Sequence, residues 1–201
     1  MGKILTISRQ LGSGGWKIGK ILSEQLNIPF YDKEIIKLAA KESGVSEEVL
    51  KYYDERQTSS LLYSLSVGSF GAMHNIVGNI NIPINDKVFE IQRNIIKKVA
   101  NEGQCIIIGR CSDYILSDRD DVINVFIYCD NDMRYKRIAE RDNISINAAI
   151  EKIKKTDRNR ANYHNYYADN KWGDINSYDL CINSKIGIEK TVEILKSVIC
   201  E

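Results

Sequence analysis

The sequence predicts one doubly wound α/β domain, in which helices cover both faces of a parallel sheet. Apolar runs of strand length alternate with segments of helical periodicity along the chain. Fully apolar strands are typical of a parallel sheet that is buried on both faces. A glycine cluster also separates the first strand from the first helix. The length of 201 residues is enough for one core, so we expect a single domain over residues 1–201.

Each predicted strand is a short run rich in β-branched residues. The strands are expected at residues 4–8, 30–31, 105–109, 122–128 and 178–183. Helices are expected where apolar residues recur at helical spacing, first at Ile18, Ile21, Leu22 and Leu26 and then over 33–41, 46–56, 87–101, 132–141, 145–163 and 188–198. Ser46, Asp86 and Ser145 are predicted N-caps, while Gly44 and Gly103 are predicted helix ends.

The composition excludes several classes of protein. There are 28 Lys and Arg residues against 27 Asp and Glu residues, a net charge of +1, so we expect no nucleic-acid partner, which would need a large basic excess. No apolar stretch approaches the ~20 residues of a membrane-spanning helix, so no membrane partner is expected either. The five cysteines form no C-x-x-C pair, and three lie in apolar runs. Such cysteines predict a reducing, cytoplasmic location.

The strongest functional motif is a glycine-rich turn between a strand and a helix, in the segment SRQLGSGGWKIGK. The backbone N–H groups of such a turn and of the helix N-terminus can hold a phosphate. Glycine is favoured because a side chain would block the phosphate and because some positions need a positive φ. Gly12, Ser13, Gly14 and Gly15 are therefore the predicted donor-phosphate site. A tight turn without a ligand is the alternative.

This turn departs from the pattern G-x-x-x-x-G-K-[ST]. With Gly14 as the last loop glycine, Arg9 replaces the first glycine, Gly15 replaces the lysine and Trp16 replaces the hydroxyl residue. A catalytic protein would need another cation to supply the missing charge. Lys17 and Arg9 adjoin the turn and are the predicted replacements. Removing either is expected to reduce turnover strongly and to leave folding nearly unchanged.

The same segment resembles the start of the cytidylate-kinase-like family. ILTISRQLGSGGWKIGKILSEQL is followed by IPFYDKEII, and similar blocks continue as CIIIGRCSDYIL, VFIYCDNDMRYKRI, KTDRNRANYH and SYDLCINS. Relatives in this family often have the same turn without lysine. Cytidylate kinases themselves have an intact loop, and an acidic residue where Cys111 follows Arg110 here. The resemblance implies a sheet of P-loop kinase type, a helical acceptor-binding insert near residues 57–85 and a lid near residues 143–175.

Two residues are expected beside the acceptor. Arg110 directly follows the apolar strand CIIIG, so it should lie at the carboxyl edge of the sheet, where ligands of such folds bind. Its guanidinium can hold a phosphate through two parallel hydrogen bonds, and a surface salt bridge is the alternative. Asp32 follows the second strand and resembles the family's acidic residue near the acceptor nucleotide. The alternative for Asp32 is an N-cap of the next helix.

Further arginines belong to the predicted helices. Arg134, Arg137 and Arg141 share one helix face, where they either bind phosphate or form a solvated basic face. Arg158 and Arg160 resemble the lid arginines of nucleoside monophosphate kinases. His74 and His164 lack the spacing of metal ligands. They are expected to pack at the surface or in the lid, and no metal site made by the protein is predicted.

The resemblance therefore implies transfer of the γ-phosphoryl group of ATP, with Mg²⁺, to a nucleoside monophosphate such as CMP. Lys17, Arg9, Arg158 and Arg160 would act on the transferred group. Two other classes remain open, a non-catalytic nucleotide-binding or regulatory protein with a degenerate turn and a kinase for a non-nucleotide small molecule. Assembly into a homo-oligomer also remains open.

Overall fold

The computed structural model describes residues 3–54 and 84–200. Within these ranges a five-stranded sheet has the strand order β2-β3-β1-β4-β5, and every neighbouring pair is parallel. The strands are β1 (Ile4–Arg9), β2 (Phe30–Tyr31), β3 (Ile106–Ile108), β4 (Val122–Tyr128) and β5 (Leu180–Asn183). The predicted doubly wound α/β fold is confirmed.

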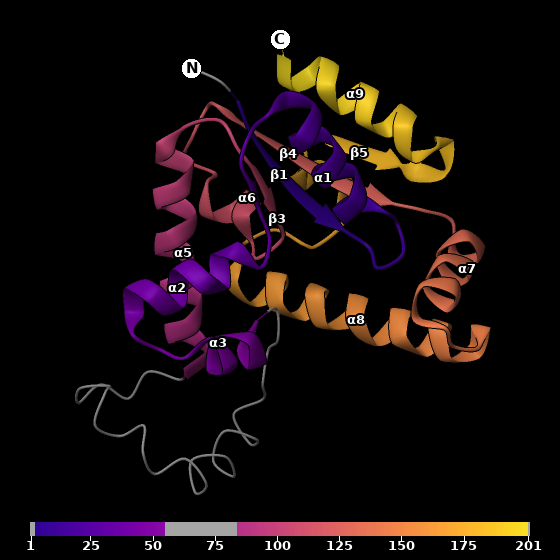
Figure 1. Ribbon diagram of the computed structural model, residues 1–201, viewed down its shortest axis with the longest axis horizontal. Helices are drawn as coiled ribbons and strands as arrows, with labels where there is room; N and C mark the ends of the chain where they lie inside the picture. The colour runs from indigo at the N-terminus through magenta and orange to yellow at the C-terminus, as the bar shows by residue number, and fades with distance from the viewer. Residues whose placement is uncertain (1–2, 55–83, 201) are drawn as a thin grey trace, which may run out of the picture.

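Helices cover both faces of this sheet (Figure 1). On one face lie α1 (Gly15–Leu26) and α9 (Ile188–Cys200), and on the other lie α2 (Glu34–Ser43), α5 (Ile84–Glu102) and the short α6 (Ser112–Ile115). Alternate side chains of a strand point to opposite faces. Ile106 and Ile108 accordingly pack with α1 and α9, whereas Ile107 packs with α2 and α5.

The remaining elements lie around the carboxyl edge of the sheet. They are α3 (Glu47–Tyr53), α7 (Asn131–Asp142), α8 (Ile146–Tyr167) and the 3-10 turn η3 (Ser184–Ile186), whereas the 3-10 turn η2 (Ile175–Ser177) directly precedes β5. Figure 1 shows α8 running along one side of the molecule, from α7 to the neighbourhood of α3 and α5. Ile138, Ala149 and Ile153 form a small apolar cluster between α7 and α8. None of the described helices is long and apolar enough to cross a membrane.

Local signals in the sequence placed most helix ends correctly. Ser46 caps α3 by accepting from Val49 N–H, Ser145 caps α8 in the same way, and α2 ends at Gly44. The predicted cap at Asp86 is wrong, because α5 begins at Ile84. Residues 57–83 of the predicted insert, with His74, lie outside the described residues.

Candidate active site

The candidate site lies at the carboxyl edge of the sheet, where β1 and β3 end side by side. Ile7 is paired in register with Ile108, so the residues that follow the two strands emerge at the same edge. Gly109, Arg110 and Cys111 all have positive φ, at 66°, 56° and 55°. These three residues turn the chain sharply from β3 into α6. For an arginine and a cysteine this conformation costs backbone energy, and such strain is frequent at functional sites.

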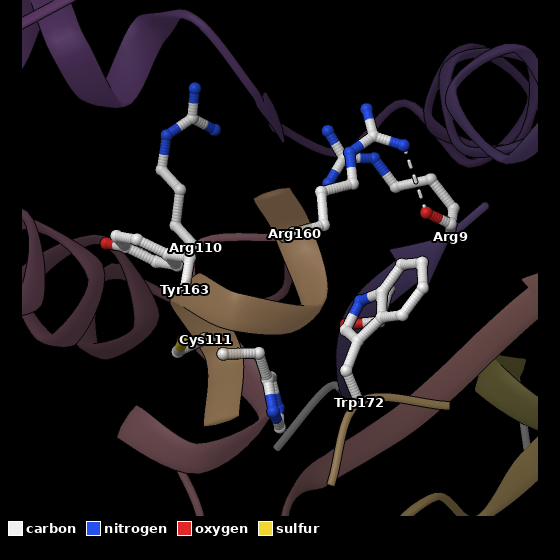
Figure 2. A pocket seen from close by; sticks show the side chains of 9 residues that line it. Arg9, Arg110, Cys111, Arg160, Tyr163 and Trp172 are labelled. Carbon is white, nitrogen blue, oxygen red and sulfur yellow. Dashed lines mark hydrogen bonds between the residues drawn. The ribbon is translucent and has the colours of Figure 1, made fainter. Parts of the chain in front are cut away.

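A small pocket opens beside this turn (Figure 2). Its lining comes from the ends of β1 and β3, from α8 and from the segment after α8, and comprises Ser8, Arg9, Gly109, Arg110, Cys111, Arg160, Tyr163, His164 and Trp172. The free space is about 10 Å³, room for roughly one water molecule. A nucleotide can therefore enter this pocket only when the lining segments move apart.

The glycine turn, which we define as residues 10–15, has the predicted backbone shape. Gly12 and Gly14 have φ of 81° and 85°. Gly14 is the N-cap of α1, without a side-chain cap, and the first turn of α1 has no acidic residue. The positive end of the α1 dipole thus meets no carboxylate from its own helix, which favours an anion there.

Protein atoms, however, already pack tightly against the glycines. A Cβ atom on Gly14 would lie 2.6 Å from Ile188 Cδ1, and one on Gly12 would lie 2.9 Å from the Arg134 carbonyl oxygen. Backbone packing at Gly12 and the positive φ of both residues therefore account for the two glycines without a ligand, and the contact with Arg134 could not be read from the sequence.

Two arginines of α7 hold the glycine turn in place. Arg134 is buried, donates to the Leu11 carbonyl oxygen at 2.8 Å and pairs with Asp157 of α8. Arg137 donates to two carbonyl oxygens of the turn at 3.1 and 3.2 Å. Arg141, the third member of this predicted group, is exposed and pairs with the aspartate next to it. In this conformation Arg134 and Arg137 hold the backbone of the turn. The sequence predicts phosphate binding or a solvated basic face for these arginines, but not this role.

Arg110 lies between two carboxylates. Its Nε and Nη2 donate to the two carboxylate oxygens of Asp54 at 2.9 and 2.8 Å, and its Nη1 donates to Asp32 at 3.3 Å. The Arg110 side chain is 2% exposed, compared with 21% for Asp54 and 14% for Asp32. We call Asp32 and Asp54 the carboxylate clamp. The salt bridge considered for Arg110 is therefore present, but it is buried rather than at the surface.

Asp32 also contacts the first turn of α1. Its second carboxylate oxygen accepts from Trp16 Nε1 at 3.0 Å, and the Trp16 ring packs edge-on against Phe30. The N-cap alternative for Asp32 is wrong, because Lys33 occupies that position of α2 and makes no side-chain cap. Asp32 therefore connects Trp16, in the first turn of α1, to Arg110.

The other predicted cations lie at different distances from the pocket. Arg160 Nη1 donates to the Arg9 carbonyl oxygen at 3.0 Å, and Figure 2 shows the two guanidinium groups side by side while Arg110 points away from them. Arg158 is exposed and is not among the pocket-lining residues. Lys17 is exposed on α1. Arg9 is only 9% exposed, so the expectation that its removal leaves folding unchanged needs correction.

A buried histidine and aspartate complete the site, and sequence reasoning missed their pairing. His164 Nε2 lies 2.8 Å from Asp113 Oδ2, and the two side chains are 3% and 2% exposed. Asp113 comes three residues after Arg110, and His164 comes four residues after Arg160. The spacing in α8 was the available signal, because His164 follows a predicted arginine by about one helical turn and so shares its helix face.

Aromatic side chains connect α8 and the segment after it to the core. Tyr163 packs against Phe89 of α5. Trp172 and Tyr178 both contact Phe126 of β4. Burial holds the pKa of Tyr178 above its usual range, so its phenol stays protonated near neutral pH.

The arrangement of glycine turn, strand-end arginine and basic helix can be compared with known proteins. Residues 4–186 match the model of the cytidylate kinase-like family. The chain belongs to this family. Two curated relatives are a cytidylate kinase of Pyrococcus horikoshii, 28% identical over 98% of this chain and 88% of the relative, and one of Staphylothermus marinus, 26% identical over 98% and 96%.

Solved structures agree with the fold. An uncharacterized protein from Eubacterium ventriosum is 30% identical, with a TM-score of 0.74 and 99% of both chains covered. A shikimate kinase from Bacteroides thetaiotaomicron has a TM-score of 0.55 at 14% identity over the full length of both chains, a likeness of fold alone. Membership of the family supports a kinase of the nucleotide or small-molecule type.

Proposed function

We propose that the protein transfers the γ-phosphoryl group of ATP to a nucleoside monophosphate, with CMP as the first candidate acceptor. The observation that carries the proposal is the position of Arg9, Arg110 and Arg160 around one pocket beside the glycine turn. Phosphoryl transfer depends mainly on positioning the reactants and on neutralising charge, which guanidinium groups can do. The names of the curated relatives supply the candidate acceptor.

The donor phosphates would bind at the N-terminus of α1. Gly14 and the first residues of α1 present backbone N–H groups there, and the helix dipole favours negative charge. Arg9 and Arg160 lie beside the turn, and Lys17 projects from the first turn of α1. Of these cations we assign the role of the missing loop lysine to Arg9, because it already lines the pocket and Lys17 does not.

The acceptor phosphate would bind Arg110. Its guanidinium is already committed to the carboxylate clamp, so the phosphate has to exchange with the Asp54 carboxylate, which presents the same two-oxygen edge. Asp32 holds the remaining Nη1 during that exchange. An acceptor phosphate oxygen then attacks the γ-phosphorus in line, forming the new P–O bond as the bond to the β-phosphate oxygen breaks and ADP leaves. No covalent enzyme intermediate is involved.

The described residues offer few ligands for Mg²⁺. Among the described residues there is no cluster of three or more His, Cys, Asp or Glu side chains that could hold a metal ion. Asp32 and Asp54 are engaged with Arg110. Mg²⁺ commonly keeps several waters and binds substrate phosphates, so the ligands would come mainly from ATP and water. We assign no step of the transfer to it.

The test is a panel of ATP and Mg²⁺ with each nucleoside monophosphate, followed by thermal shift and by ADP release. We expect ADP release that depends on the acceptor and is fastest with CMP. Arg160→Met should reduce turnover by a factor of about 10² or more, as expected when transition-state charge loses its partner. Arg93→Met is the matched control, because Arg93 is exposed on α5 and pairs only with Glu90 among the described residues.

Two results would redirect the proposal. ATP binding without ADP release for every monophosphate would favour the non-catalytic nucleotide-binding protein, whose motivation is the missing loop lysine. ADP release with a non-nucleotide acceptor alone would favour the small-molecule kinase. Equal turnover of the Arg160→Met and unmodified proteins would remove Arg160 from the mechanism.

A further inference from the structure

The pairing of Asp113 and His164 is unusual for a contact that only stabilises the fold. Both side chains are almost completely buried, and one hydrogen bond of 2.8 Å joins them. The second polar atom of each, Asp113 Oδ1 and His164 Nδ1, has no hydrogen-bond partner among the described residues. Unmatched buried polar atoms lower stability. An apolar pair of the same volume would avoid that loss.

The location of the pair suggests what it does. Asp113 is in α6, directly after the turn of left-handed residues that carries Arg110. His164 is in α8, one helical turn beyond Arg160 on the same face. His164, Arg110 and Arg160 all line the same pocket. The hydrogen bond therefore joins the two segments that carry the arginines.

The hydrogen bonds of Tyr163, Tyr167 and Asp157 join α8 to other parts of the protein. Tyr163 donates to Gln92 and Tyr167 donates to Asp86, both in α5. Asp157 accepts from the Leu11 N–H in the glycine turn. These bonds hold α8 to α5 and to the turn, but not to the strained segment after β3.

We infer that Asp113 and His164 form a positioning pair that fixes Arg110 relative to Arg160, so that both guanidinium groups can contact one polyphosphate-like anion. The turn with positive φ at Arg110 and Cys111 is strained, and relaxation of this turn would shift the segment that carries Arg110 relative to α8. The 2.8 Å hydrogen bond between these two buried side chains opposes that shift. The inference rests on the proposed function, since the anion is the phosphate chain of the reaction.

The test measures binding of inorganic pyrophosphate by titration calorimetry, without turnover. His164→Ala should weaken binding about tenfold or more, while His164→Gln, whose amide can still donate to Asp113, should stay within about threefold of the unmodified protein. Tyr167→Phe is the matched control, because it removes a different bond of the same helix and should leave pyrophosphate affinity unchanged.

A second measurement separates positioning from general stability. In an Arg160→Met background, His164→Ala should cause little further loss, because a pair that acts through Arg160 has nothing left to position. A purely structural role predicts that the two losses add. If His164→Ala does not fold, the double substitution Asp113→Leu with His164→Phe keeps the buried volume and removes the bond, and it should show the same loss.

The outcomes distinguish this inference from the proposed function. Pyrophosphate binding by the unmodified protein with equal affinity in the His164 variants overturns the positioning pair alone. Fully additive losses in the Arg160→Met background overturn it as well. Failure of the unmodified protein to bind pyrophosphate overturns both the inference and the phosphate site on which it rests.

Discussion

Replacing Asp54 by asparagine should lower stability and raise acceptor affinity together. The substitution removes the charge partner of a buried guanidinium that forms two bonds of 2.8 and 2.9 Å with it. Breaking a buried ion pair typically costs about 3–5 kcal/mol. Here Asp32 keeps its 3.3 Å contact with Arg110, and Asp54 is 21% exposed, so we expect a smaller loss of about 2 kcal/mol. For a chain of this length that corresponds to a melting temperature roughly 4–8 °C lower.

The same substitution should increase the affinity for the acceptor. In the proposed function the acceptor phosphate displaces the Asp54 carboxylate from Arg110, and a neutral asparagine would compete less strongly. CMP should therefore bind more tightly to Asp54→Asn in calorimetric titration, although the variant melts earlier by circular dichroism. Glu90→Gln, which alters an exposed pair on α5, is the control and should change stability by less than about 0.5 kcal/mol. An unchanged melting temperature, or weaker CMP binding, would refute the exchange of carboxylate for phosphate.

Three further predictions concern single side chains. Arg9→Ala should reduce turnover by about 10²–10³ and also lower the melting temperature, whereas Lys17→Ala should leave the melting temperature unchanged; unaltered turnover in both would exclude either as the missing cation. Burial raises the pKa of the Cys105 thiol to about 12 from its usual 9.0, so its contribution to stability is complete below pH 9 and is lost as the pH rises toward 12. At pH 8 a thiol reagent followed by mass spectrometry should label Cys105 only after unfolding, and rapid labelling of the folded protein would contradict its burial. Trp16→Phe leaves Trp172 as the single tryptophan, and its emission should change when ATP binds at the pocket that it lines; constant emission at saturating ATP would argue against binding there.

Local sequence patterns were sufficient to predict the sheet and most of the helix ends. A cap such as Ser46 acts on an amide three residues away, so its signal is complete within one short segment. The apolar run of β4 likewise contains its own evidence of burial on both faces. The error at Asp86 has a similar local origin, because a good cap residue was taken as the helix start. Its carboxylate accepts instead from Tyr167, 81 residues away.

The candidate site was only partly predictable, because its pairings are distant in sequence. Arg110 was expected at a strand end, and it is there, but the carboxylate clamp depends on Asp54, 56 residues away. The Asp113–His164 bond spans 51 residues. A single sequence gives residue types at such positions without saying which of them meet. The packing of Ile188 against Gly14 was hidden for the same reason.

The hydrogen bond from the Ser184 hydroxyl to the Ser13 carbonyl oxygen has a consequence for how the protein is made. The two residues are 171 positions apart, and Arg137 binds the same carbonyl from 124 positions away. On a ribosome, the strand and helix that flank the glycine turn emerge early, but the side chains that fix the turn emerge much later. Nascent chains that end before β5 therefore lack one of the groups that anchor this turn. Nucleotide binding should consequently appear only near the end of synthesis, when the last part of the chain has left the exit tunnel.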